Sequence, residues 1–185
     1  MAPSAARSPV VTLRWLGVLG LASAIALGCV TSESDDGSST DVSSTEALST
    51  SPTGFESSMV EVVGLDGSIR EGCMWIADTP ELRARGMMEA TGFGAAEAMV
   101  FVQETPVSGQ FWMKNTVIPL SIAYFDALGR YLGSHDMTPC TTPECERYPT
   151  ASGYRWAVEA PLGGLAALGI GAGSSLRVTD RSCPG

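Results

Sequence analysis

The chain has 185 residues and a formal net charge of −9, which suits one folded domain with accessory segments. This charge argues against nucleic-acid binding, because an acidic surface repels phosphate. Residues 1–28 contain two arginines and no acid, so the chain without them carries 9 basic and 20 acidic residues, or −11.

Residues 1–28 have the pattern of a secretory signal peptide. The apolar run from Trp15 to Leu27 follows the two arginines and is shorter than a typical membrane span. It ends in small residues before Cys29, which resembles a bacterial lipobox whose cysteine is lipidated and becomes the new N-terminus. The usual leucine three positions before the cysteine is Ala26 here. An ordinary signal peptide followed by a chance cysteine is therefore the alternative.

The segment after the cysteine is predicted to be a disordered tether. Residues 31–58 contain 15 serines or threonines, six acids and no base, so they cannot bury enough apolar area to offset the entropy of ordering. A random coil of this length reaches about 30 Å, which would hold a domain clear of a bilayer. Val30 stands where inner-membrane lipoproteins often carry Asp, so the outer membrane is favoured if the cell has one.

Residues 59–185 are predicted to form one β-rich domain. Thr79 and Pro80 are typical of an N-cap and a first helical position, so a short helix is expected to end near Gly86. One or two helical turns are expected over 162–168. Alternating or apolar runs bounded by turn residues predict about eight short strands, at 59–63, 69–77, 98–102, 110–114, 120–126, 130–137, 154–159 and 175–180. The pattern favours a mainly β fold, a single compact β-sandwich or barrel-like domain with one or two short helices.

Four cysteines remain after Cys29, and an even number in an exported chain indicates disulfides. Three pairings are possible. We favour Cys140–Cys145, which would close a proline-rich loop over 138–153, and Cys73–Cys183, which would tie an early strand to the C-terminus. A four-cysteine zinc site is the alternative, although no CxxC spacing supports it.

Several segments together resemble the domain-of-unknown-function family 192, found in bacteria and archaea. They are 77–88 (ADTPELRARGMM), 97–102 (EAMVFV), 111–126 (FWMKNTVIPLSIAYFD) and 158–163 (VEAPLG). The resemblance spans essentially 59–181, and the loop from Pro139 to Pro149 is similar to that of exported members. It implies a compact β fold of sandwich type and brings no established activity, substrate or catalytic residue. Ser121 stands where the family carries the aspartate of a Pro-Leu-Asp sequence. Any role which that aspartate has in relatives is therefore in doubt for this chain.

Ser121, His135 and Asp136 are the residue types of a hydrolase triad. A hairpin that turns at Ala127–Leu128 would place Ser121 opposite Ser134 and would point His135 to the other face. No Gly-x-Ser-x-Gly elbow is present. We therefore expect no serine hydrolase.

The strongest polar candidates follow the aromatic pair at 111–112. Trp112 and Lys114, the only lysine of the chain, would share one face of an alternating strand, and an aromatic beside a cation suits a carboxylate or sugar ligand. Asn115, Arg83 and Glu159 complete the tentative ligand-binding set, and Glu159 could pair with an arginine. The alternative is structural, with Asn115 holding its loop and Lys114 in a salt bridge.

The preferred function is a lipid-anchored envelope domain that binds a ligand or scaffolds other components without catalysis. Its expected partners are the membrane, through Cys29, and an unknown small molecule or glycan, with no cofactor, metal or nucleic acid. The alternative is an envelope enzyme acting on glycans, which would need Lys114, Glu97 and Glu159 to converge beside Trp112. A redox module using Cys140 and Cys145 would need an exposed, reducible pair.

Overall fold

The computed structural model describes residues 50–184. The predicted signal peptide, Cys29 and the tether up to residue 49 lie outside the described residues. No helix between residues 50 and 184 has both the length and the apolar character needed to cross a membrane.

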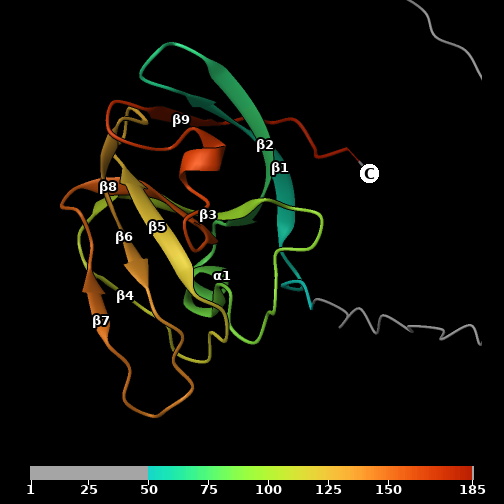
Figure 1. Ribbon diagram of the computed structural model, residues 1–185, viewed down its shortest axis with the longest axis vertical. Helices are drawn as coiled ribbons and strands as arrows, with labels where there is room; N and C mark the ends of the chain where they lie inside the picture. The colour runs from blue at the N-terminus through green and yellow to red at the C-terminus, as the bar shows by residue number, and fades with distance from the viewer. Residues whose placement is uncertain (1–49, 185) are drawn as a thin grey trace, which may run out of the picture. The chain divides into compact units, whose positions relative to one another are not determined.

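The domain is mainly β, as predicted, with nine strands, one short α-helix and one 3-10 turn (Figure 1). The helix α1 covers Pro80–Arg85, and the 3-10 turn η1 covers Ala166–Leu168. The strands are β1 (Glu56–Val63), β2 (Ile69–Ala77), β3 (Ala98–Val107), β4 (Gln110–Trp112), β5 (Leu120–Phe125), β6 (Tyr131–Met137), β7 (Arg147–Pro149), β8 (Tyr154–Pro161) and β9 (Ser175–Val178).

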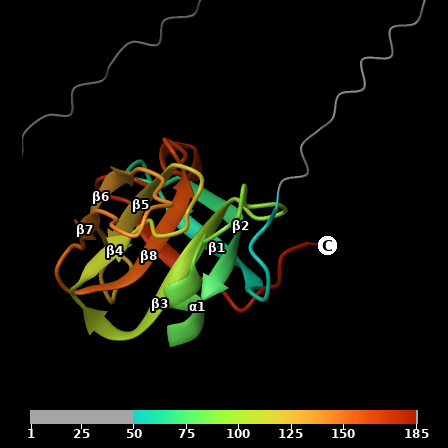
Figure 2. The ribbon, with the colours of Figure 1, turned by 90° about the horizontal axis from the view of Figure 1, so that it is seen from below.

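Seven strands form a mixed sheet in the order β6-β5-β8-β3-β2-β1-β9, and β4 pairs with β7 in a second sheet. Only β2 and β3 of the large sheet run parallel. Their connection contains α1, which lies beside β3 when the molecule is viewed from below (Figure 2). The sheets are not closed into a barrel.

The expected boundaries differ from the structure at three places. β1 begins at Glu56, so the predicted start of the domain at residue 59 falls inside a strand. The proline-rich loop contains a ninth strand, β7, which pairs with β4 through Phe111 and Tyr148. The β5–β6 ladder places Ser121 opposite Asp136 rather than Ser134. This register differs by two residues from the expected one, and a shift of two keeps every side chain on its predicted face.

Each face of the large sheet covers its own hydrophobic core. The first core contains Phe101, Met113 and Tyr124, and Leu82 of α1 and Phe111 of β4 pack against it. The second core contains Val60 and Phe125, which come from opposite halves of the sheet, together with Leu168 of η1. Alternation along β8 decides which side chains enter which core, since Ala157 faces the first and Val158 the second.

Both disulfides favoured from the sequence are formed, Cys73–Cys183 and Cys140–Cys145. The four cysteines therefore lie in two separate pairs rather than in one cluster of zinc ligands. Cys73–Cys183 closes a loop with a sequence separation of 110 residues, which contributes roughly 4–5 kcal/mol in the chain-entropy model. This link fixes the C-terminal segment to β2.

The two ends of the sheet meet at the β5–β6 turn, where Leu176 of β9 donates a backbone hydrogen bond to the Gly129 carbonyl (2.8 Å). Gly129 has φ +76°, and a Cβ at this position would lie 2.1 Å from the carbonyl oxygen of Leu176. Gly129 therefore meets two requirements, a left-handed backbone and close backbone approach.

We expect Gly129→Ala to lower the free energy of unfolding by roughly 2–5 kcal/mol, because backbone strain and a clash with Leu176 add together. Gly67→Ala is the matched control, since Gly67 has φ +78° and a methyl group added there would meet nothing within 4 Å. It should cost roughly 1–2 kcal/mol. Urea unfolding of both variants measures the difference, and equal losses would show that the contact with Leu176 is unimportant.

Candidate functional site

A small pocket lies where β8, β4, the Met113–Thr116 turn and the end of α1 come together. Its polar lining includes Glu159, Thr116 and Trp112, and its apolar lining includes Phe101 and Phe111. The volume is about 30 Å³, which is room for about two water-sized groups. Three of the five residues predicted to bind a ligand line this pocket, namely Glu159, Trp112 and Arg83.

Glu159 is the buried acid of the pocket. It lies on β8 between Met99 of β3 and Ile122 of β5, both residues of the first core. The residue is only 4% exposed, and no hydrogen bond or ion pair reaches its carboxyl group from anywhere in residues 50–184. Burial raises the pKa of Glu159 from 4.5 to about 8, because an apolar environment disfavours the charged form. The carboxyl group is therefore protonated at neutral pH.

Thr116 provides the second buried polar group of the pocket. Its backbone closes the Met113–Thr116 turn by donating to the Met113 carbonyl (2.9 Å), and its own carbonyl accepts from Cys140 (3.1 Å). The residue is 4% exposed, and within the described part of the chain its hydroxyl has no hydrogen-bond partner. The side-chain atoms of residues 50–184 that are both fully buried and unpartnered belong to Tyr124, His135, Arg155 and Trp156. The polar atoms of Glu159 and Thr116 are not among them, so they keep contact with the pocket, where water or a bound molecule can satisfy them.

Trp112 carries two cations on its ring. Arg147 lies opposite it in the β4–β7 ladder with the guanidinium 3.9 Å from the ring centroid, and the Lys114 ammonium lies 5.1 Å from that centroid. Alternation explains the arrangement, because Phe111 and Met113 enter the first core while Trp112 and Lys114 point the other way. Such contacts stabilise by about 0.5–2 kcal/mol each. The expected aromatic–cation pair is therefore present.

The two arginines of α1 are held by backbone carbonyls. Arg83 donates to the carbonyls of Asp78 (2.5 Å) and Val102 (2.8 Å), and Arg85 donates to that of Thr53 (2.5 Å). Neither forms an ion pair with Glu159, so the suggested Glu159–arginine pair is wrong.

Asn115 lies outside the pocket lining. It is exposed and has φ 55°, a left-handed conformation that asparagine tolerates better than most residues. Its carbonyl accepts a hydrogen bond from Glu89 (2.8 Å). Its position matches the structural alternative, in which Asn115 holds its loop.

Glu97 is not part of the pocket. It forms an ion pair with Arg70 (2.5 Å) and lies beside Gly72 and Met74, and Met74 belongs to the second core. The convergence of Lys114, Glu97 and Glu159 that a glycan-cleaving site would need is therefore not formed.

The serine and histidine of the hypothetical triad lie on opposite faces of the sheet. The Ser121 hydroxyl donates to the Asp136 carboxylate (2.5 Å) and accepts from the Gly163 backbone (2.9 Å). His135 stacks on Tyr148, with centroids 5.6 Å apart. Ser121 therefore has no histidine beside it, and it holds β5 to β6 and to the segment after β8.

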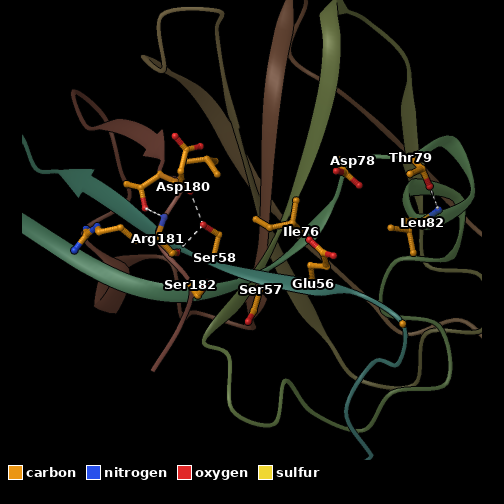
Figure 3. Close-up of a pocket in the computed structure, with 13 residues that line it drawn as sticks. Glu56, Ser57, Ser58, Ile76, Asp78, Thr79, Leu82, Asp180, Arg181 and Ser182 are labelled. Atoms are coloured by element: carbon orange, nitrogen blue, oxygen red, sulfur yellow. Dashed lines mark hydrogen bonds between the residues drawn. The ribbon is translucent and has the colours of Figure 1, made fainter. Parts of the chain in front are cut away.

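A wider groove of about 650 Å³ lies between the start of β1, the end of β2, α1 and the segment after β9 (Figure 3). Several of its hydroxyls already have partners. Ser58 lies 2.5 Å from the Thr179 carbonyl, and Thr79 accepts from the Leu82 backbone (3.2 Å). The polar side chains that line this groove are exposed or half-buried, so the groove lacks buried polar residues such as Glu159 and Thr116. No group of three or more histidine, cysteine or acidic residues within the part of the chain described here could hold a metal ion.

Sequence reasoning missed Thr116 and Arg147. Thr116 directly follows the residues singled out in FWMKNT, so the motif itself was a usable signal. Arg147 lies in the predicted loop, and only its pairing with β4 reveals that it faces Trp112.

Residues 62–178 match the model of family DUF192, described as "Uncharacterized ACR". The match covers more than half of the chain, so the chain belongs to this family, as the sequence resemblance predicted.

Solved structures share the fold. One is a protein of unknown function from Novosphingobium aromaticivorans, with a TM-score of 0.59 and 28% identity, covering 71% of this chain and 94% of the other. Another, from Sinorhizobium meliloti, is described as a candidate transcription regulator and has a TM-score of 0.57 and 21% identity over 69% of this chain and 97% of the other. No curated protein matches the chain.

We expect the raised pKa of Glu159 to make the protein less stable as pH rises. The folded state binds more protons than the unfolded state between pH 4.5 and about 8, so the free energy of unfolding should fall across this window by roughly 5 kcal/mol in total. Glu159→Gln should remove this slope, because glutamine stays neutral.

Urea unfolding at several pH values measures the effect, with Glu104→Gln as the control because Glu104 is an exposed β3 residue. The difference between wild type and variant cancels contributions from other groups, such as His135, whose pKa burial lowers. Parallel pH profiles of wild type and Glu159→Gln would contradict the burial argument.

Proposed function

We propose that the chain is an exported, lipid-anchored protein whose β domain binds a ligand at the Glu159 pocket without catalysing a reaction. The observation that carries this proposal is the pair of side chains Glu159 and Thr116, each 4% exposed and without a protein partner, in one pocket. Their polar atoms are not among the fully buried, unpartnered atoms of residues 50–184, so they face the pocket. A bound molecule can form hydrogen bonds with both of them.

Trp112 gives the ligand a surface beside the pocket. Its ring lines the pocket and is flanked by Lys114 and Arg147. Aromatic side chains with polar neighbours are typical of small-molecule sites, where a few polar groups fix the orientation of the ligand.

Export is supported by the two disulfides, which are compatible with an oxidising compartment. Lipidation of Cys29 and residence in the outer membrane are proposed from the lipobox-like end of the leader and from Val30.

An envelope enzyme acting on glycans is the second candidate, favoured by the protonated state of Glu159 at neutral pH, which a general acid needs. Glycosidases ordinarily use two carboxyl groups. Among residues 50–184, Glu159 is the only acidic residue that lines the pocket, so binding is the better proposal. Transcription regulation is not carried over from the Sinorhizobium meliloti neighbour, because a net charge of −9 opposes binding to DNA.

The proposal predicts that soluble cell-wall fragments shift the indole NMR resonance of Trp112 in the full chain. Trp75 is the internal control, because its indole donates to the Phe93 carbonyl (2.8 Å) within the first core. Thr116→Val should weaken binding several-fold, since it removes the hydroxyl at nearly constant volume. Ligands that bind without moving the Trp112 resonance would place the site elsewhere. Release of a glycan product that Glu159→Gln abolishes would favour the enzyme.

The anchor predicts a lipid on Cys29. Mass spectrometry of the mature protein should find a chain that begins at Cys29 and carries acyl groups, and Cys29→Ser should leave the protein unlipidated and released from membranes. An unmodified N-terminus at another residue would contradict the lipoprotein proposal and leave the binding site untouched.

A further inference from the structure

The basic residues of the domain fall into two groups. Four arginines form all of the ion pairs found among residues 50–184, and they are Arg70, Arg130, Arg177 and Arg181. Five basic residues have no carboxylate partner there, namely Arg83, Arg85, Lys114, Arg147 and Arg155. Of these, Arg83 and Arg85 line the Glu159 pocket, and Lys114 and Arg147 flank its Trp112. Arg83 and Arg85 are held by backbone carbonyls, and the Arg85 guanidinium lies over the Phe55 ring. Lys114 and Arg147 are therefore the cations that stand beside the pocket, on Trp112.

The floor of the pocket supplies hydrogen-bond donors. Glu159 is protonated at neutral pH, so it presents an O–H group, and Thr116 presents another. Arg83 and Arg85 of α1 line the pocket with Glu159, and Tyr124 of β5 lies near it. Burial is the cause of the raised pKa of Glu159, with no contribution from a nearby charge. Burial raises the pKa of Tyr124, with smaller contributions from Tyr154 and Glu159, so Tyr124 is also neutral. Among residues 50–184 no other acidic side chain lines the pocket, and the Lys114 and Arg147 cations on Trp112 favour an anion beside it.

The size of the pocket suits a small anionic group. A volume of about 30 Å³ accepts about two water-sized groups, which matches the two oxygens of a carboxylate. The apolar walls, Phe101, Phe111 and Trp112, suit the carbon stem behind such a group.

We propose that the pocket binds a small carboxylate group, which accepts hydrogen bonds from Glu159 and Thr116 and is attracted by the cations around Trp112. The inference rests on the proposed binding function and assigns its ligand class. The affinity of the pocket for a carboxylate should then depend on pH, because an ionised Glu159 cannot donate a hydrogen bond and repels the ligand. Binding should be strong below pH 8 and should weaken by about tenfold between pH 7 and pH 9, as expected for the loss of one proton.

The test titrates the full chain with acetate, acetamide and ethylammonium, three probes of similar size and different charge, and follows the Trp112 indole resonance. Acetate should bind at least tenfold more tightly than the other two probes at pH 7. Two further probes distinguish a peptide C-terminus from a small free acid as the ligand. They are an N-acetylated dipeptide with a free C-terminal carboxylate and the same dipeptide as its C-terminal amide. If the ligand is a peptide C-terminus, the dipeptide with the free carboxylate should bind more tightly than acetate.

Variants separate the contributions of Glu159 and Lys114 to acetate binding. Glu159→Gln should still bind acetate, because an amide N–H donates, and should lose the tenfold weakening between pH 7 and pH 9. Lys114→Gln should weaken acetate binding two- to fivefold in low salt. Arg130→Gln, which removes a cation paired with Asp126, is the control and should bind as wild type does.

Equal or tighter binding of acetamide or ethylammonium at Trp112 would overturn the carboxylate assignment and leave the pocket as a binding site. Absence of any Trp112 response to acetate would also overturn it. The cell-wall fragments described above would then still test the binding function itself.

Discussion

The structure depends on the burial of one carboxyl group in an apolar face of its central sheet. Glu159 occupies β8, which lies between β3 and β5, and its neighbours across both ladders are the core residues Met99 and Ile122. An ionised carboxylate there would cost several kcal/mol, so the group is held neutral. Even a neutral carboxyl group loses hydrogen bonds to water when it is buried. The two cores and the Cys73–Cys183 disulfide have to offset this cost.

The side chains around the Glu159 pocket have to be held in fixed positions, because the pocket admits only a small group. The first core holds Phe111 and Met113 on one side of the FWMKNT segment, and this leaves Trp112 and Lys114 on the other. The turn at Asn115 then places Thr116 at the pocket. The backbone bond from Cys140 to Thr116 connects this turn to the loop that Cys140–Cys145 closes. The family motif therefore builds one wall of the pocket through backbone geometry as well as through side chains.

Local patterns in the sequence predicted much of this architecture. The alternation of β1, the strands at 69–77 and 154–159, the Thr79 N-cap and the cysteine count each depend on neighbouring residues or simple parity, and the structure contains all of these features. β8 is buried on both faces, because it lies between β3 and β5. The parallel pairing of β2 with β3 and the ninth strand β7 depend on contacts between distant segments. Periodicity carries no information about such contacts.

The same contrast between local patterns and distant contacts explains why only part of the site was predicted. Trp112 and Lys114 share a face because they are two residues apart on an extended chain, and this rule needs no tertiary information. The sequence suggested that Glu159 could pair with an arginine. The arginines instead bind carbonyls of Asp78, Val102 and Thr53, which only the packing of α1 decides. Arg147 reaches Trp112 through the β4–β7 ladder, so its role could not be foreseen from the loop in which it lies.

The most direct test is the titration of the Glu159 carboxyl carbon by NMR in the folded protein, with assignment by Glu159→Gln. We predict a midpoint near pH 8, well above the ordinary value of 4.5, and an upward shift when acetate is bound. A midpoint near 4.5 would show that Glu159 is ionised and solvated at neutral pH, which would contradict both the buried site and the donor role on which carboxylate binding depends.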